Sequence, residues 1–416
     1  MWWKEAVIYE LYVDKFAGNF SGLSEKLDYL KDLGINCLHI LPHYPSPMVD
    51  DGYDVSDYKG VRRELGTLED FKKLTERAHA MGIKIIVDLV LNHASTKHPL
   101  FIEASKKEGS ARNMFLWSKS GKEFPDAINA FSKIKPKNWI WSEAAKSYYF
   151  STFYPEQADF NWANPAVLVF FTDVMDFWAG QGADGFRIDA ASHIAKKERT
   201  NCKGLPETHA ILIKLRSHID KNYPDVILLA EVHDGILKMK DYFDRGAECH
   251  LTYNFYLNER IFLSFVRGDK SIFYAALKEC AEIPPNSAWA NVLRSHDETS
   301  LSGLTEAERK EVLDRFDQER KYSFEAYTAM RLASMFKGDK EKILGAFRML
   351  FEAPGAHVIY YGDEIGMENE EVSADEDMRR VVRGKFDWAR AGLERGDPSS
   401  LFSNIKGIIK EHAVGK

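Results

Sequence analysis

Short runs of apolar residues recur along the chain and alternate with stretches in which apolar residues return every three or four positions. The runs are rich in Val, Ile, Leu and Ala, which is typical of parallel strands covered on both faces. Between them, residues such as Leu23, Leu27, Leu30 and Leu33 follow one face of a helix. We expect strands at 6–13, 36–41, 84–91, 185–189, 226–231, 251–255, 290–293 and 357–361.

Three of the expected helices pass into a strand through the same signal. Gly34, Gly82 and Gly182 each stand just before a strand, where a glycine supplies the left-handed cap that ends a helix. Strands that alternate with helices predict an α/β fold with a mostly parallel sheet. Eight such units favour a closed (β/α)8 TIM barrel over an open doubly wound sheet.

Polar side chains stand at the C-terminal ends of the predicted strands, where parallel barrels carry their catalytic face. Arg187 and Asp189 share one face of a short apolar strand because side chains alternate along it. Buried charges are costly unless they are paired or used, so this pair is either a structural bridge or part of a site. Further polar residues at strand ends are Asp88, Asn92, His93, Glu231, His296 and Asp297.

Two connections are too long for simple loops. Residues 94–163, about seventy residues, exceed the usual length of such a connection and are rich in aromatic side chains. We expect them to form an inserted subdomain, with the barrel made of residues 1–93 and 164–416. Its aromatic residues would form a minicore for the most part, or else stack on sugar rings. The second connection, 301–327, is expected to be a solvated helix, although its position would let it border the site.

Composition limits the classes of partner and compartment. The formal net charge of −7 over 416 residues argues against nucleic acid or an anionic membrane as the main partner. The N-terminus has no signal-peptide pattern and no stretch reaches transmembrane length. The four cysteines lack metal-ligand spacing, so we expect a reduced, cytoplasmic protein. Its oligomeric state is left open.

Several ordered motifs resemble glycoside hydrolase family 13, the α-amylase superfamily, and within it the α-glucosidase and trehalose synthase branch. The resemblance covers nearly the whole chain and includes segments 88–93, 185–189, 229–231, 296–297 and 157–161. It extends to 44–47, 51–54, 357–367 and 383–388. Many motifs in the correct order are far more specific than any one alone.

The resemblance implies roles for three acids. Asp189 would be the nucleophile, Glu231 the general acid/base and Asp297 the carboxylate that stabilises the transition state. Retaining glycosidases use two carboxyl groups about 5 Å apart, one ionised and one protonated. We expect Arg187 to keep Asp189 ionised, and apolar flanks and nearby acids to raise the pKa of Glu231.

The resemblance also implies a substrate pocket closed at one end. His93 and His296 would hydrogen-bond hydroxyls of the reacting glucose, and Tyr53 would belong to the same pocket. Asp54 and Arg383 would form an ion-paired clamp on the terminal glucose, which restricts the enzyme to disaccharides and chain ends. Ala190 resembles the residue of members that act on α-1,4 bonds.

Some positions depart from the family pattern. Ser295 replaces the usual Asn, and segment 383–387 departs from the common Arg-Thr-Pro-Met-Gln. The loop 15–21 lacks the acid-rich, calcium-binding pattern of many relatives, so we expect no metal and no cofactor. The C-terminal β-sandwich domain that normally follows the barrel is expected to be absent.

Three functions follow from these patterns. The first is a retaining α-glucosidase that hydrolyses or transfers glucose from short maltose-like or sucrose-like α-glucosides. The second is an isomerase that interconverts maltose and trehalose by intramolecular transfer; exclusion of water decides between the two. The third is a non-catalytic barrel scaffold, whose expected sign, a lost acid, is missing.

Overall fold

The computed structural model describes residues 1–106, 111–373 and 376–414. Within these ranges eight parallel strands close into a barrel in the order β1-β16-β12-β11-β10-β9-β3-β2. This confirms the predicted (β/α)8 fold. The strands are β1 (Val7–Leu11), β2 (Cys37–Ile40), β3 (Lys84–Leu89), β9 (Gly185–Ile188), β10 (Ile227–Ala230), β11 (Leu251–Asn254), β12 (Ala288–Val292) and β16 (Ala356–Tyr360).

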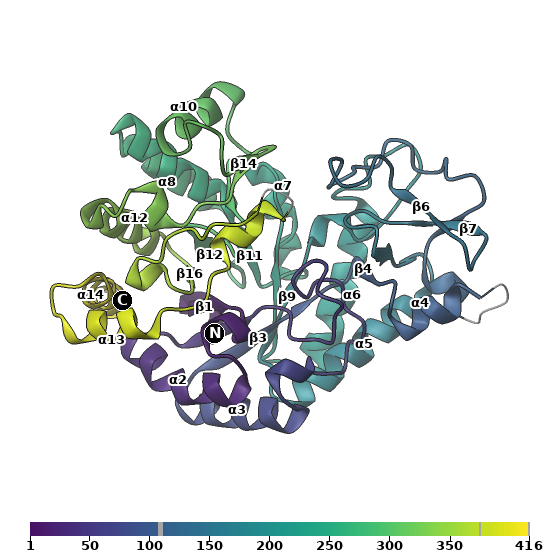
Figure 1. Cartoon of the computed structure of the whole chain (residues 1–416), viewed down its shortest axis with the longest axis horizontal. Coiled ribbons are helices and arrows are strands. Elements are labelled where there is room, and N and C mark those ends of the chain that lie inside the picture. The colour runs from purple at the N-terminus through teal and green to yellow at the C-terminus, as the bar shows by residue number, and fades with distance from the viewer. Residues whose placement is uncertain (107–110, 374–375, 415–416) are drawn as a thin grey trace.

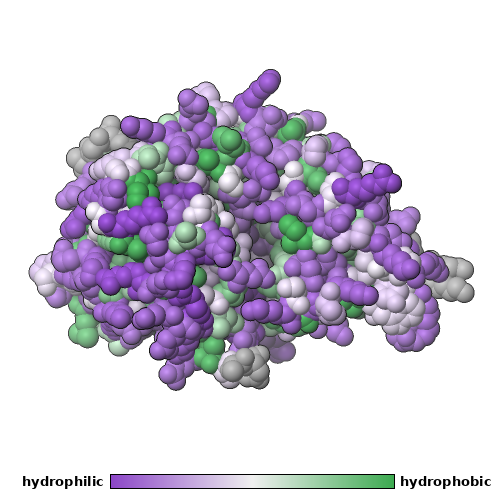
Figure 2. Space-filling view, turned by 90° about the horizontal axis from the view of Figure 1, so that it is seen from above, coloured by the Kyte–Doolittle hydropathy of each residue, from purple (hydrophilic) through white to green (hydrophobic). Residues whose placement is uncertain are grey.

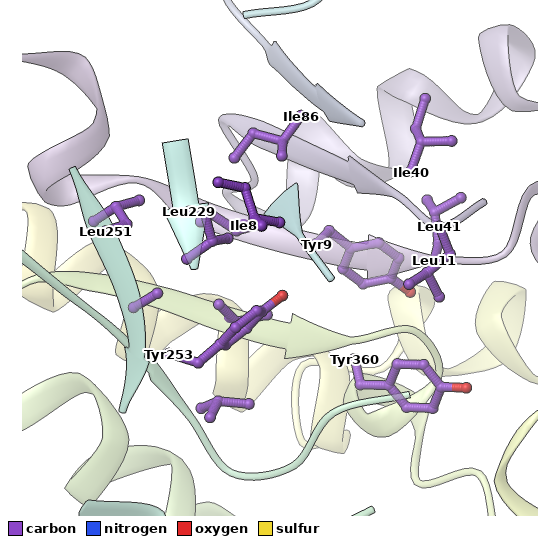
Figure 3. Close-up of a cluster of buried hydrophobic side chains, with 14 of the residues drawn as sticks. Ile8, Tyr9, Leu11, Ile40, Leu41, Ile86, Leu229, Leu251, Tyr253 and Tyr360 are labelled. Carbon is purple, nitrogen blue, oxygen red and sulfur yellow. The ribbon is translucent and has the colours of Figure 1, made fainter. Parts of the chain in front are cut away.

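The barrel interior is filled by side chains from all sides of the ring. Figure 3 shows Ile8, Leu229 and Leu251 among the residues that meet there, and each is fully buried. The fourth strand begins with Gly185, because a Cβ at this position would lie 2.7 Å from Ile227 Cγ1. A larger residue here would force the side chain of Ile227 to shift, so glycine lets β9 fit closely between its neighbours.

Helices form an outer ring around the strands (Figure 1). They begin with the signals seen in the sequence: Thr67 and Asp70 form a capping box, and Asn164 caps a helix that starts with Pro165. The last helix, α14, packs on both α2 and α12 and so completes the ring. The larger helices are α2 (Phe20–Leu33), α3 (Leu68–Ala80), α5 (Pro165–Gly180), α6 (Pro206–Asn222), α8 (Phe255–Arg267), α9 (Ser271–Cys280), α12 (Lys340–Glu352), α13 (Trp388–Gly396) and α14 (Leu401–Val414).

The connection after β3 projects from the barrel at the right of Figure 1. It contains a three-stranded antiparallel sheet in the order β5-β7-β6, and a pair, β4 and β8, joins it to the barrel. Its aromatic rings contact one another, as in Phe101 against Trp117 and Phe115 against Phe160, which fits a minicore. The elements are β4 (His93–Ser95), α4 (Pro99–Ala104), β5 (Trp117–Ser118), β6 (Trp139–Ser142), β7 (Ser147–Phe150) and β8 (Gln157–Asp159).

The connection after β12 forms a smaller layer at the top of Figure 1. Helix α10 (Glu306–Phe316) is mostly solvated, as expected. Around it, β13 (Thr299–Ser300), β14 (Ser323–Phe324) and β15 (Tyr327–Thr328) make a sheet in the order β13-β15-β14. Short helices complete the chain: α1 (Val13–Phe16), α7 (Ile236–Asp241) and α11 (Leu332–Met335).

Three segments that belong to the predicted domains lie outside the described residues: 107–110 of the inserted subdomain, and 374–375 and 415–416 of the barrel. In the part of the chain that is described, α14 is the last element of the barrel. None of the described helices has the length and apolar character needed to span a bilayer. The face in Figure 2 is mostly hydrophilic, with small scattered hydrophobic patches.

Candidate active site

A cavity of about 330 Å³ opens at the C-terminal ends of the barrel strands. It is walled by the barrel, by the connection after β3 and by the β14–β15 hairpin. Of the nine residues proposed from the sequence, five line it: Tyr53, His93, Asp189, Glu231 and Asp297.

Arg187 is the polar centre beneath this cavity. Its side chain is 1% exposed, and Nη1 donates to Asp88 Oδ1 (2.5 Å) and to Asp189 Oδ1 (2.9 Å). Nη2 lies 2.7 Å from Glu231 Oε1. Because one guanidinium holds both Asp189 and Glu231, the two carboxyl groups are neighbours, as covalent glycoside chemistry requires.

The turn after β9 adds a second contact between the two acids. Ala190 has φ 44°, in the left-handed region that favours glycine, and the chain turns sharply just after Asp189. This turn aims the Ala190 amide at Glu231, to which it donates a hydrogen bond of 3.0 Å to Oε2. The backbone conformation next to one acid therefore fixes the other.

The protonation of these two acids differs from both expectations: the raised pKa of Asp189 contradicts the prediction that Arg187 keeps it ionised, because burial and the neighbouring acids outweigh the guanidinium. Burial, and next to it Glu231 and Asp88, raise the pKa of Asp189 well above its usual range against the opposing effect of Arg187. Burial also acts to raise the pKa of Glu231, but Arg187 and His233 outweigh it and lower the pKa to about 2. The expectation of a raised pKa for Glu231 is wrong for the free protein, because Glu231 faces charged donors and not the apolar side chains beside it in sequence.

Asp297 is held in the ionised state by three cationic groups. Its Oδ2 lies 3.3 Å from His296 Nε2, its Oδ1 lies 3.3 Å from Arg379 Nη1, and Arg383 contacts the same oxygen. Burial opposes ionisation, but His296, Arg379 and Arg383 hold the pKa of Asp297 well below its usual range.

The predicted clamp between Asp54 and Arg383 is wrong. Asp54 is fully buried and accepts hydrogen bonds from Ser46 Oγ (2.7 Å) and from the amides of Val49 (3.1 Å) and Asp50 (3.2 Å). It therefore closes its own loop instead of facing the cavity. Arg383 contacts Asp51 and Asp297 and lines a neighbouring cavity of about 300 Å³.

A different ion pair, between Arg379 and Asp50, stands in the wall of the cavity that holds the three acids. Arg379 Nη2 donates to Asp50 Oδ1 (2.6 Å) and to Asp377 Oδ2 (2.6 Å), and both Asp50 and Arg379 line the cavity. Gln157 Nε2 donates to the other oxygen of Asp50 (2.9 Å). A tight turn at Asp51 (φ 44°) and Gly52 (φ 109°) separates Asp50, which lines the cavity, from Asp54, which is bonded within its own loop.

The two predicted histidines occupy different layers. His93 lines the cavity, and burial lowers its pKa; its Nε2 lies 3.2 Å from the carbonyl oxygen of Tyr53. His296 is fully buried behind the wall, between Tyr53 Oη (2.7 Å from Nε2) and Glu10 Oε1 (3.0 Å from Nδ1). Burial acts to lower the pKa of His296, but Asp297 and Glu10 raise it to about 10.

A network under the cavity links these groups. His39 lies between Asp88 (3.1 Å from Nε2) and Glu10 (3.1 Å from Nδ1), and Glu10 in turn contacts His296. Tyr53 donates to Asp88 Oδ2 (3.3 Å). Charged side chains on β1, β2, β3 and β9 and the residues after β12 thus support one another.

The residues of the opposite wall were not among the site residues proposed from the sequence, although the second connection, 301–327, was expected to be able to border the site. His233, after β10, stacks on Phe255 at 3.9 Å between ring centroids, and its Nε2 lies 3.5 Å from Glu298 Oε1 and 3.9 Å from Glu231 Oε1. Phe324 and Tyr327 of the hairpin lie beside them in the cavity wall. The hairpin therefore borders the site, and the only signal for Glu298 was its place next to Asp297.

An ammonium group stands where the inserted segment meets the barrel. Lys196 Nζ lies 2.9 Å from Asp159 Oδ2 and donates to Asn92 Oδ1 (2.8 Å) and to the His193 carbonyl. It thereby satisfies oxygen atoms of the kind that bind Ca²⁺. In the described ranges, no group of three or more His, Cys, Asp or Glu side chains is arranged to hold a metal ion.

Comparison with known proteins agrees with the fold and the motifs. The model of the alpha amylase catalytic domain matches residues 12–399. Trehalose synthase of Thermus thermophilus is 38% identical over 94% of this chain and 41% of its own length; trehalose synthase/amylase TreS of Mycolicibacterium smegmatis is 36% identical over 99% and 72%. The crystal structure of a trehalulose synthase from Pseudomonas mesoacidophila superposes with a TM-score of 0.79, at 22% identity, over 99% of this chain and 84% of that one.

This chain thus spans less than half the length of the first of these relatives and about seven tenths of the second. The match to the catalytic-domain model nevertheless covers both insertions and the barrel strands from β2 to β16. The chain belongs to the alpha-amylase catalytic-domain family, glycoside hydrolase family 13, in its α-glucosidase and trehalose synthase branch.

Proposed function

We propose that this chain is a retaining enzyme that cleaves and transfers α-linked glucose from short α-glucosides through a covalent glucosyl-enzyme. The observation that carries the proposal is the position of Asp189 and Glu231 on one guanidinium in one cavity. In the free protein the proton is favoured on Asp189; in the reacting state it lies on Glu231, so that the ionised Asp189 attacks the anomeric carbon and Glu231 gives the proton to the leaving oxygen and later takes one from the acceptor hydroxyl.

The remaining cavity residues have roles that follow from their contacts. Asp297, held ionised by its cationic neighbours, stabilises the positive charge that develops on the sugar ring. Tyr53 and His93 bind the reacting glucose. We call the wall of Asp50, Tyr53, Asp189, Asp297 and Arg379 the donor side, and the wall of His233, Glu298, Phe324 and Tyr327 the acceptor side.

Substrate size follows from the donor side. The Arg379–Asp50 ion pair stands across the end of the cavity, so a glucose held against it has no room for a further sugar behind it. This supports disaccharides and chain ends as substrates over the interior of starch. We further propose that residues 94–163 form a distinct subdomain B over the donor side.

A second candidate is the interconversion of maltose and trehalose. Both relatives described above carry trehalose synthase in their names, and the cavity holds walls on both sides of Glu231 that could retain the released glucose. Hydrolysis and isomerisation share the covalent intermediate, so the acids do not separate them.

The compartment and partners follow the same logic. The four cysteines Cys37, Cys202, Cys249 and Cys280 are free and buried, which supports a reducing, cytoplasmic location. The partners are small α-glucosides. The acidic net charge argues against nucleic acid as a binding partner.

One experiment tests the proposal. The protein is incubated separately with maltose, trehalose, sucrose and starch, and proton NMR follows the configuration and identity of each product. Products that appear first in the α-configuration support the mechanism, whereas β-configured products would contradict it. Trehalose formed from maltose with little glucose selects the isomerase, and free glucose in step with substrate loss selects the hydrolase.

A further inference from the structure

Glu298 is a buried acid in the cavity wall to which the mechanism above gives no role. It is 8% exposed and follows Asp297 directly in sequence, yet the two carboxyl groups have different partners. Asp297 contacts Arg379 and Arg383, whereas the carboxylate of Glu298 faces His233 on the acceptor side.

The backbone of Glu298 is fixed by Ser295. The Glu298 carbonyl accepts from the Ser295 amide (3.0 Å) and hydroxyl (3.2 Å), and the Glu298 amide donates to Ser295 Oγ (3.3 Å). The Asp297 amide donates to the same hydroxyl at 3.2 Å. A serine thus closes one tight turn that presents Asp297 to one wall and Glu298 to the other.

His233 fixes the side chain of Glu298. Its ring lies nearly parallel to Phe255 (14°) and edge-on to Tyr327 (84°, 5.4 Å between centroids), so it has little freedom to turn. Its Nδ1 has no hydrogen-bond partner in the part of the chain that the structure describes. Nε2 is therefore the polar contact of this ring, and it faces Glu298 and Glu231 together.

This geometry places Glu298 beside the sugar that leaves. The leaving oxygen has to reach Glu231, and Glu298 is joined to Glu231 through one imidazole nitrogen. Sugar hydroxyls are neutral donors, and a carboxylate that accepts from them makes charge-assisted hydrogen bonds. The aromatic rings of Phe324 and Tyr327 stand next to it in the same wall and offer apolar faces to a sugar ring.

We propose that Glu298, positioned by Ser295 and His233, binds a hydroxyl of the leaving glucose and holds that glucose in the cavity during the life of the covalent intermediate. The glucose can then attack again before water does. Glu298 thereby sets the share of transfer over hydrolysis. This inference rests on the proposed function, and it adds the residue that decides between its two outcomes.

The test compares wild type with Glu298→Gln, which keeps the size of the side chain and removes its charge. With p-nitrophenyl α-glucoside as donor, the leaving group carries no sugar hydroxyls, and added glucose serves as acceptor. Because the variant loses a hydrogen bond to a charged group, the half-saturating concentration of glucose should rise about tenfold or more. The share of free glucose among the products of maltose should rise about fivefold, while p-nitrophenol release falls less than threefold.

Two control variants sharpen the test. Glu306→Gln, at an exposed position at the start of α10, should leave the acceptor dependence unchanged. Glu298→Asp should recover part of the transfer because it restores the carboxylate.

The outcomes separate this inference from the proposed function. A wild-type protein inactive on every α-glucoside would overturn both. An active wild type whose Glu298→Gln variant keeps its acceptor dependence and product ratio would overturn the inference alone. An equal loss with p-nitrophenyl α-glucoside and with maltose would assign Glu298 a structural role and overturn it as well.

Discussion

The donor side of the cavity and its acceptor side differ in how many polar contacts hold each functional group. On the donor side, Arg187 alone contacts Asp88, Asp189 and Glu231, and Arg379 contacts Asp50, Asp297 and Asp377. On the acceptor side, the one cationic group within 4 Å of the Glu298 carboxylate in the described part of the chain is His233.

The difference follows from what each side must do. The donor side binds one sugar in one geometry and stabilises a defined charge, which rewards fixed dipoles prepared in advance. The acceptor side must accommodate a sugar that leaves, turns or is replaced by water. Stacked rings and a carboxylate with a single cationic partner make this wall less densely paired than the donor side. The predictions below probe the contrast from the largest effect to the smallest.

Replacing Asp189 by Asn should cause the largest loss. The substitution keeps the size of the side chain and its place beside Arg187 but removes the nucleophile, so kcat/KM should fall by about three orders of magnitude or more, on the order of 4 kcal/mol in the barrier. Steady-state rates on maltose and a thermal melt measure activity and folding together. Activity within tenfold of wild type in a folded variant would remove Asp189 from the nucleophile role.

Lys196→Met tests the buried ammonium group that contacts Asp159 where the inserted segment meets the barrel. The change leaves Asp159 buried without its ammonium partner, and breaking a buried pair costs about 3 kcal/mol or more. Denaturant unfolding should show this loss. EDTA should leave the melting temperature of the wild type unchanged, because an ammonium and not Ca²⁺ satisfies these oxygens.

The control for this prediction is Lys197→Met. Its ammonium pairs with Glu207 at the surface, where an ion pair contributes little. Equal stability losses for the two lysine variants, or a wild type that EDTA destabilises and calcium restores, would refute this account of Lys196.

Arg379→Ala tests the closed end of the donor side. It removes the partner of Asp50 and one of the cations that hold Asp297 ionised, so kcat/KM on maltose should fall about a hundredfold, or about 2.7 kcal/mol. Activity on maltotriose relative to maltose should rise because the wall opens. Arg380→Ala is a matched control, since Arg380 is the next residue, is half-buried and pairs with Asp51 and Glu376. A variant of Arg379 with unchanged preference for chain length would refute the wall.

The same contrast shows what the sequence could predict. Apolar runs located the barrel strands, and a strand end has few choices of direction, so Asp189 and Glu231 were placed in the cavity from strand position and resemblance together. Loops have no regular spacing of apolar residues from which the direction of a side chain could be predicted. Next to the left-handed turn at Asp51, Asp50 lines the cavity in place of the predicted Asp54. Its partner, Arg379, lies in a 3-10 helix at 378–382.

The acceptor side was harder to predict for a related reason. His233 and Glu298 lie just beyond strand ends, where side-chain direction depends on contacts such as that of Ser295 with Glu298. The prediction of a raised pKa for Glu231 was wrong for the same reason. The direction of its pKa shift depends on which hydrogen-bond donors and charges face the carboxylate in space. The residues next to Glu231 in sequence do not indicate these contacts.

The smallest effect concerns stability against pH, and it distinguishes the two sides once more. Burial and the charge of Asp297 raise the pKa of Glu298 to about 7 in the folded protein, against a usual value near 4.3 for Glu. The folded state therefore binds the proton more tightly than the unfolded chain. Its contribution to stability is complete below about pH 4 and is lost as the pH rises through about 7.

Glu298→Gln should remove this part of the pH dependence. Between pH 5 and pH 7.5 the decline in melting temperature should be smaller in the variant by about 2 °C, a modest shift because a large chain has a large unfolding entropy. Glu306→Gln, at its exposed position, should follow the wild-type curve. If the melting temperature of Glu298→Gln declines as steeply as that of the wild type, ionisation of Glu298 does not lower the stability of the folded state. The acceptor side would then stabilise its carboxylate as well as the donor side does.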